Sequence, residues 1–224
     1  MAIVKKYKAK VEEIINPLPD IYTVTFSSDK KFIYKPGQFL HLALDDYDGA
    51  GQWPESRCFS MQSSANNPHI KITFAVKGIF TKRMAGELHK GKDVWLKMPY
   101  GELFAQQHSK VNTVFIAGGT GITPFLSLFT HESFNKYINP RIYLGFRSKK
   151  YNIYENELNF EEHSDIKIFY EDAGCIIDIQ SIFAKNGTDN DYFISGPPKM
   201  LETFKCFLLS KGLDEKKIKT DNWE

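Results

Sequence analysis

Cysteine is scarce in this sequence: its 224 residues include three, Cys58, Cys175 and Cys206. Three scattered thiols cannot build a disulfide framework or a closed zinc site, and they cannot supply the four thiolates of an iron–sulfur cluster. The six histidines also stand singly, without an H-E-x-x-H or similar pair. We therefore predict no metal centre in this chain.

The sequence also lacks an excess of charge of one sign and a long apolar run. Its 29 Lys and Arg residues nearly balance 27 Asp and Glu residues, which leaves a formal charge of +2 and no electrostatic reason to expect nucleic acid as a partner. We interpret the basic segment 5–10 as the solvated face of a strand. No apolar run reaches membrane-spanning length, and the start has no secretory pattern. These absences predict a soluble, cytoplasmic protein without membrane insertion.

The first half of the sequence reads as short strands separated by turns rich in Pro, Gly, Asn and Asp. Six strands at this spacing indicate an antiparallel barrel, interrupted by one helix near 81–88. The expected strands are 7–15, 22–27, 38–44, 57–62, 70–76 and 93–98.

From residue 111 onward, expected strands and helices alternate, which is typical of a parallel sheet with helices on both faces. The polar segment 106–110 separates the two patterns. The predicted fold is therefore β followed by α/β, with a six-stranded antiparallel barrel at 1–107 and a Rossmann-like domain at 108–224. The second domain is expected to have strands at 113–117, 141–146, 166–170 and 192–195, and helices near 124–134, 154–160, 178–184 and 199–211.

The segment AGGTGITP at 117–124 follows an apolar strand. Its glycines suit neither a strand nor a helix, so we expect a tight turn into a helix that has Thr123 as its N-cap and Pro124 at its first position. Backbone N–H groups and the positive end of the helix dipole would then converge on one phosphate-binding point. Pro124 stands where the usual dinucleotide fingerprint has its third glycine. Taken alone, the turn is also compatible with a purely structural role.

Three further segments accompany this turn: RCFS at 57–60, VKGIFT at 76–81 and SGPPKM at 195–200. In this order the four segments resemble the motifs of the ferredoxin–NADP reductase superfamily of flavoenzymes, and the resemblance covers nearly the whole chain. It implies that the barrel binds a flavin and that the α/β domain binds NADPH or NADH. FAD is preferred because the loop at 78–81 looks like that of the FAD-binding branch, although residue chemistry alone leaves FMN open.

The resemblance assigns roles to individual residues. Arg57 would bind the flavin pyrophosphate, as its planar, permanently charged donors suit that group. Phe59 would pack beside the flavin, and Ser60 would hydrogen-bond to its ring. Ser195 would lie beside the nicotinamide, where relatives often carry cysteine, and Trp223 would cover the flavin until the nicotinamide enters. The alternatives are a surface arginine for Arg57, core packing for Phe59 and a frayed terminus for Trp223.

The remaining candidates concern phosphate groups. Gly78 and Thr81 would bind the flavin pyrophosphate, unless they form an ordinary turn with an N-cap threonine. Arg147 and Ser148 follow the second α/β strand and would favour the 2′-phosphate of NADPH, unless Arg147 pairs with a nearby glutamate. The full predicted cofactor-binding set is Arg57, Cys58, Phe59, Ser60, Val76, Lys77, Gly78, Thr81, Gly118, Gly119, Thr120, Gly121, Thr123, Pro124, Arg147, Ser148, Ser195, Gly196, Pro197 and Met200.

The activity implied by the resemblance is transfer of hydride from NAD(P)H to bound FAD, followed by electron transfer to an external acceptor such as a ferredoxin or a flavodoxin. Ser60, Ser195 and Trp223 are the candidate catalytic residues. No Ser–His–Asp or paired-carboxylate pattern occurs, which fits chemistry carried by cofactors. Two alternatives stay open: a reductase that releases free reduced flavin, and a non-catalytic subunit that senses nucleotides.

Overall fold

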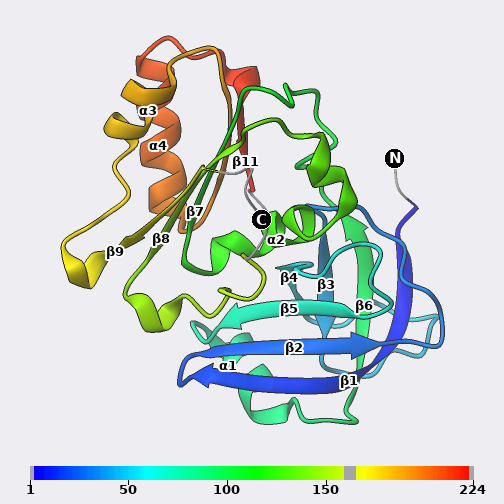
Figure 1. The fold of residues 1–224 in the computed structure, drawn as a ribbon. Coiled ribbons are helices and arrows are strands. Elements are labelled where there is room, and N and C mark those ends of the chain that lie inside the picture. The colour runs from blue at the N-terminus through cyan, green and yellow to red at the C-terminus, as the bar shows by residue number, and fades with distance from the viewer. Residues whose placement is uncertain (1–2, 159–164, 222–224) are drawn as a thin grey trace.

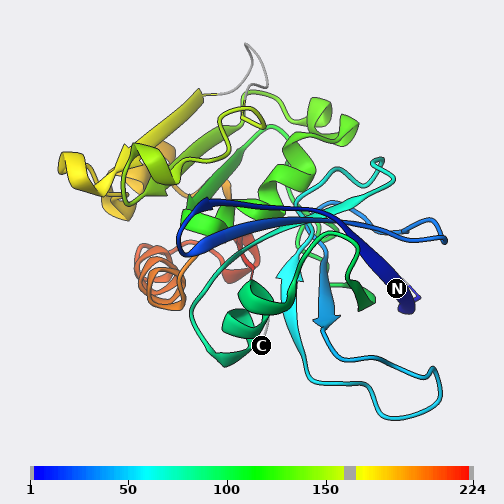
Figure 2. The same ribbon diagram turned by 90° about the horizontal axis from the view of Figure 1, so that it is seen from below.

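The computed structural model describes residues 3–158 and 165–221. It contains a six-stranded antiparallel sheet and a five-stranded parallel sheet, which lie beside one another (Figures 1 and 2). The first sheet curls into a nearly closed barrel, and helices cover both faces of the second. The predicted fold class is therefore confirmed.

The barrel strands follow the order β4-β3-β6-β1-β2-β5. The gap between its two edge strands is bridged just beyond β4, where the Gln62 N–H donates to the Lys71 carbonyl at 2.8 Å. The connection 44–55 projects from the barrel (Figure 2). The strands are β1 (Lys5–Leu18), β2 (Ile21–Ser27), β3 (Phe39–Ala43), β4 (Ser56–Ser60), β5 (Ile70–Ala75) and β6 (Asp93–Tyr100).

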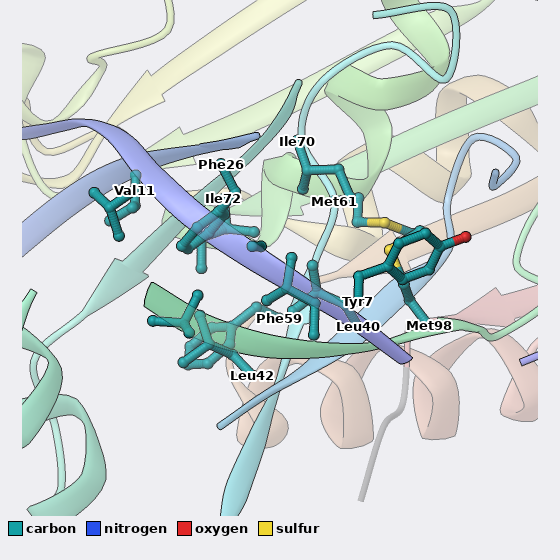
Figure 3. Packing of buried hydrophobic residues seen from close by; sticks show 14 of the residues in the cluster. Tyr7, Val11, Phe26, Leu40, Leu42, Phe59, Met61, Ile70, Ile72 and Met98 are labelled. Atoms are coloured by element: carbon teal, nitrogen blue, oxygen red, sulfur yellow. The ribbon is translucent and has the colours of Figure 1, made fainter. Parts of the chain in front are cut away.

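Alternation of apolar and polar residues explains the barrel. In the first part of β1, Tyr7, Ala9 and Val11 point inward while the intervening lysines face solvent. The inward side chains meet those of the other strands in one apolar core (Figure 3). Phe80 and Met84 of α1 (Ile79–Glu87) add to this core, so the helix is anchored to the barrel.

The parallel sheet has the order β11-β10-β7-β8-β9. Alternate residues of its central strands build two cores, one on each face. The sequence reasoning predicted four of the five strands and missed β11. The strands are β7 (Thr113–Gly118), β8 (Arg141–Phe146), β9 (Asp165–Tyr170), β10 (Asp191–Ser195) and β11 (Ile218–Thr220).

Helices α3 (Ile179–Asn186) and α4 (Pro198–Ser210) cover one face of this sheet, and α2 (Thr123–Phe129) lies on the other (Figure 1). The expected helix 124–134 was too long. It ends at Phe129, where the Thr130 hydroxyl donates to the Leu126 carbonyl, and a separate 3₁₀ turn follows at Glu132–Lys136.

Two other helix predictions were wrong in detail. Thr123 is the first residue of α2 and not its N-cap, because a 3₁₀ turn at Gly119–Ile122 extends to it, and Pro124 takes the second position. The expected helix at 154–160 is absent over 154–158, which forms hydrogen-bonded turns, and its last two residues lie outside the described part. The predicted domain boundary at 107/108 stays a prediction; it falls within the connection 101–112.

One buried hydrogen bond directly joins the barrel to the unit that contains the parallel sheet, called the α/β unit below. The Gly37 N–H, from the barrel, donates to the Ser127 hydroxyl of α2 at 2.7 Å. A second contact uses Glu157, whose carboxylate accepts from the Gln62 amide and from the Lys71 ammonium, each at 3.2 Å. In the described part of the chain, no helix is both long and apolar enough to cross a membrane.

Candidate functional site

A cavity of about 1130 Å³ lies between the barrel and the parallel sheet. Its walls include residues of β4 and β5 and the ends of four parallel strands, at Gly118, Phe146, Ser195 and, just past β9, Glu171. These are carboxyl ends, and ligands of open α/β sheets bind at that edge. The cavity is therefore the candidate functional site.

Two backbone turns on the α/β side contact each other because both carry glycine. A Cβ at Gly121 would lie 2.6 Å from the Gly196 Cα and 2.7 Å from the Ser195 carbonyl carbon, which no side chain could tolerate without movement of the backbone. Gly196 has φ +155°, and a Cβ there would meet the Met200 methyl at 2.8 Å. The predicted segments 118–121 and 195–200 are thus one structure, formed by backbone in close contact.

The other two glycines of the segment 118–121 are required for different reasons. Gly119 has φ +56°, a left-handed conformation that favours glycine, and nothing obstructs its position. A Cβ at Gly118 would meet the Met200 sulfur at 3.0 Å and Pro197 Cδ at 3.2 Å. The wall is therefore open backbone at Gly119, as the approach of a phosphate requires, whereas Gly118 packs against Met200 and Pro197. Thr120, Thr123 and Pro124, which were predicted to bind a cofactor, line the cavity beside it.

Two predicted catalytic serines from different sheets converge on one carboxylate. The Ser60 hydroxyl donates to Asp221 Oδ2 at 3.2 Å, and the Ser195 hydroxyl donates to the same oxygen at 3.4 Å. Both serines are buried, and Asp221 is partly buried just after β11, where its N–H donates to the Ile194 carbonyl. The structure thus brings Ser60 and Ser195 together, 135 positions apart in the sequence (195 − 60). Trp223 lies outside the described residues.

The barrel contributes an apolar wall around β4. Phe59 lines the cavity and also belongs to the barrel core, where its ring meets that of Phe74 edge to face at 6.1 Å. Cys58 lines the cavity and contacts the His41 ring, and burial raises the pKa of its thiol. Val76 and Lys77, two further predicted cofactor-binding residues, also line the cavity.

Four predicted residues do not line the cavity: Arg57, Gly78, Thr81 and Ser148. Arg57 is exposed, pairs with Glu55 at 3.0 Å, and lies over the Phe80 ring of α1 at 5.3 Å. It therefore lies beside the first turn of α1 and is not part of the cavity lining.

Gly78 and Thr81 are joined by a hydrogen bond. The Thr81 hydroxyl accepts from the backbone N–H groups of Lys77, at 2.9 Å, and Gly78, at 3.0 Å. Thr81 is the third residue of α1 and Gly78 is its N-cap, so the alternative of an N-cap threonine was wrong. The first-turn N–H groups of α1 beyond Gly78 are the ones that remain for a ligand.

Arg147 lines the cavity. Its ion pair is with an aspartate and not with the nearby glutamate that was considered above. Its guanidinium lies 3.9 Å from Asp20 of the barrel and 5.6 Å from the centre of the Tyr151 ring, while Glu157 pairs with Lys71. The Ser148 hydroxyl is buried without a hydrogen-bond partner among the described residues. Arg147 thus bridges the two sheets' units at the rim of the cavity.

Sequence reasoning missed several residues of the cavity wall. Asp20 and Thr73 come from the barrel, and Tyr154 and Glu171 come from the loops after β8 and β9. Burial raises the pKa of the Tyr154 hydroxyl, which lies near Thr73. The available signal was topological: once the parallel strands were predicted, every loop at their carboxyl ends was a candidate wall. Within the described ranges, no group of three or more His, Cys, Asp or Glu side chains could hold a metal ion.

Comparison with known proteins agrees with this geometry. No family model matches the sequence. The chain is 26% identical over 200 residues to the reductase component of propane 2-monooxygenase from Mycolicibacterium smegmatis, covering 80% of this chain and 56% of that one. It is 32% identical over 167 residues to a probable dihydroorotate dehydrogenase B electron transfer subunit from Methanocaldococcus jannaschii, covering 73% and 56%. It therefore spans little more than half the length of either relative.

Among solved structures, a ferredoxin NADP⁺ reductase from Neisseria gonorrhoeae, with bound FAD and NADP, superimposes with a TM-score of 0.78 at 17% identity. The match covers 99% of this chain and 100% of that one. At this identity the likeness establishes the fold alone. The chain is thus similar in sequence to reductase and electron transfer components and in fold to a ferredoxin NADP⁺ reductase, which agrees with the resemblance to the ferredoxin–NADP reductase superfamily.

Proposed function

We propose that this chain is an FAD-dependent reductase that oxidises NADPH or NADH and delivers the electrons to an external acceptor. The observation that carries the proposal is the convergence of Ser60 and Ser195, from two separate sheets, on Asp221 inside one cavity. When bound, FAD would supply the redox chemistry, accepting a hydride and releasing electrons singly. The protein's own task is to hold and orient the two cofactors and to exclude water.

The residues present fit these cofactors. The cavity of about 1130 Å³ exceeds the range of roughly 300–1,000 Å³ typical of sites for one small molecule, so two flat rings can share it. Phe59 would pack against the flavin ring. Arg57 and the first turn of α1, which contains no acidic residue, would hold its pyrophosphate. The backbone of the segment 118–121, which is open at Gly119, would hold the diphosphate of the nicotinamide nucleotide.

The serine–carboxylate cluster would position the reacting rings. Each buried hydroxyl can donate to Asp221 or turn to a ligand, so the cluster can exchange an internal hydrogen bond for one to a cofactor. Asp221 would keep both hydroxyls oriented while the site is empty of nicotinamide. Trp223 stays part of the proposal as the residue that covers the flavin.

Arg147 supports a preference for NADPH. It lies at the end of β8, lines the cavity, and its contact with Asp20, at 3.9 Å between two exposed side chains, is weak and replaceable. We expect kcat/KM to favour NADPH at least about tenfold, since one charge-assisted bond contributes about 1.5–3 kcal/mol. Arg147→Ala should remove most of this preference, whereas Lys149→Ala should keep it. Equal values for both cofactors in the wild type would contradict the assignment.

The names of the relatives support an external acceptor. Both sequence relatives are named as components that serve another protein, one as a reductase component and one as an electron transfer subunit. A ferredoxin, a flavodoxin or an oxygenase component is the class of acceptor we propose, and the cytoplasm is the compartment in which we place the reaction.

The test is an absorbance titration of the protein after reconstitution with FAD. Anaerobic NADPH should bleach the flavin bands of the bound cofactor, and the flavin should stay bound through dialysis. Failure of both FAD and FMN to bind would overturn the proposal. Bleaching followed by loss of reduced flavin would instead favour a reductase that releases flavin, and binding without bleaching would favour a nucleotide sensor.

A further inference from the structure

A second hollow lies at the opposite edge of the parallel sheet, where β7, β10 and β11 begin. Its volume is about 630 Å³. One wall is the connection between the two sheets, residues 106–109, and the other is the segment that enters β11 with Lys216, Lys217 and Lys219. Asp191, the first residue of β10, lies at its base. The cavity of the proposed reductase site shares none of these residues.

The charges of this hollow do not balance. Asp191 is its one acidic residue, and both of its oxygens are engaged: Oδ2 accepts from the Ser109 N–H at 2.8 Å, and Oδ1 accepts from Lys219 at 3.3 Å. The side chain of Lys219 is 1% exposed, so it needs this carboxylate as its counter-charge. Asp191 is thus fully used by groups that form the base of the hollow.

Two further lysines, Lys216 and Lys217, belong to the lining of the hollow. Lys217 donates to the Thr188 carbonyl at 2.8 Å, a neutral acceptor. Among the described residues neither Lys216 nor Lys217 forms an ion pair, although the Asp214 carboxylate, outside the lining, accepts from the Lys216 backbone N–H at 2.9 Å. The lining therefore carries two lysines that have no ion-pair partner within it.

Neutral residues form the opposite wall. The His108 ring donates through Nδ1 to the Gln106 carbonyl at 2.6 Å, and its other nitrogen accepts from the Tyr137 hydroxyl at 2.7 Å. Behind this ring stands Lys110, a further cation that contacts both His108 and Tyr137. Gln106 and Gln107 complete this wall, which has no carboxylate among its lining residues.

We propose that this hollow binds a phosphate group, held by Lys216 and Lys217 and separate from the proposed cofactor cavity. A phosphate carries close to two negative charges at neutral pH and so matches the two lysines that have no ion-pair partner within the lining. Lysine serves as a point-charge ligand for phosphate. The inference is independent of the proposed reductase activity.

The experiment is an NMR titration of the isotope-labelled protein with inorganic phosphate, at constant ionic strength adjusted with chloride. Saturable shifts are expected at the amides of Ser109, Lys216 and Lys217, and they would be distinguished from any shifts at the glycine turn of the cofactor cavity. The double variant K216Q/K217Q should weaken binding at these amides at least tenfold. The charge-matched control K30Q/K31Q, on exposed barrel lysines, should bind within twofold of the wild type.

A second arm identifies the source of the phosphate. Adenosine monophosphate that binds at least tenfold more tightly than inorganic phosphate at the same amides would show that the hollow takes a nucleotide, and equal affinity would show that the phosphate group suffices. Either result supports the site. No saturable shift at Ser109, Lys216 and Lys217 in the wild type, or unchanged affinity in K216Q/K217Q, would overturn it.

Discussion

At the scale of single residues, Asp221 stands out because it holds both predicted catalytic serines. Its carboxylate accepts two hydroxyl hydrogen bonds, one from each sheet's unit. A hydrogen bond to a charged group contributes about 1.5–3 kcal/mol, against about 0.5–1.5 kcal/mol for a neutral one. The ionised carboxylate therefore fixes the serine geometry more firmly than an amide of the same shape would.

Asp221→Asn should consequently lower the rate of flavin reduction by NADPH about tenfold while leaving the fold intact. The measurement is anaerobic stopped-flow absorbance on the FAD-reconstituted protein. Asp189→Asn removes an exposed carboxylate of the α/β unit and serves as the matched control. A rate in Asp221→Asn equal to that of the control would remove Asp221 from the reacting geometry.

Lys110 gives a pH prediction. Burial, then the charge of Lys136, lowers its pKa from the ordinary 10.5 to about 8, and its contacts His108 and Tyr137 supply no counter-charge. Between these two values the unfolded chain binds more protons than the folded one, so the contribution of Lys110 to stability rises with pH. Burial raises the pKa of Tyr137, which acts in the opposite sense above about pH 10.

We therefore expect the unfolding free energy of the wild type to rise relative to that of Lys110→Met between pH 7.5 and 9.5. The measurement is urea unfolding of both proteins at each pH. Lys30→Met, which removes an exposed lysine of the barrel, should show a constant difference from the wild type over the same range. A constant difference for Lys110→Met as well would contradict the assigned pKa.

At the scale of elements, the two turns of the cofactor cavity depend on one interatomic distance. Gly121→Ala would place a methyl group 2.6 Å from the Gly196 Cα, so one turn must move. We expect a loss of about 1–3 kcal/mol in unfolding free energy and weaker binding of NADP⁺. Gly86→Ala, in α1 with open space around it, should be neutral or stabilising by up to about 1 kcal/mol. Equal behaviour of the two variants in denaturation would contradict the close packing.

The individual strands also show which parts of the fold could be predicted from the sequence. The long strands were predicted because apolar residues alternate over many positions, as around Tyr7 and Val11. Strand β11 was missed because three residues give no period, and Lys219, its central residue, is buried against the usual preference of lysine. The ammonium group of Lys219 is compensated by Asp191, which is distant in sequence, and it also donates to the Lys216 carbonyl.

The candidate site was predictable to a similar extent. The resemblance of four ordered motifs to one family predicted that Ser60 and Ser195 serve one site, and both residues line the same cavity. The walls formed by Tyr154 and Glu171 could not be predicted. Both residues lie in loops, and the conformation of a loop depends on tertiary packing. The hydrophobic periodicity of the sequence does not predict such a conformation.

At the scale of the whole molecule, the two sheets' units are joined by contacts of unequal strength. The ion pair of Lys71 with Glu157 is partly exposed and contributes at most about 1 kcal/mol. The Ser127 hydroxyl is fully buried, accepts from the Gly37 N–H and donates to the Pro124 carbonyl, both at 2.7 Å. Its removal would leave a buried donor of the barrel without a partner.

Ser127→Ala should therefore cost about 1–3 kcal/mol of unfolding free energy and loosen the junction between barrel and sheet. Ser210→Ala is the matched control, because the Ser210 hydroxyl also donates to the carbonyl three residues earlier and, being exposed, spans no junction. Hydrogen exchange at the Gly37 amide should accelerate in Ser127→Ala alone. Unchanged protection there would show that the contact does not hold the two units together.

The edge position of β11 also has a consequence for biosynthesis. A nascent chain can form the barrel first, and then β7 to β10, as each segment leaves the ribosome. Asp221 arrives only after Ile218–Thr220 has added to the edge of the sheet, beside β10. The serine cluster therefore cannot assemble until residue 221 has left the ribosome. A nascent chain that still lacks β11 would carry both glycine turns without the carboxylate that orients the site, so the binding geometry would be completed in one step, when β11 adds to the sheet.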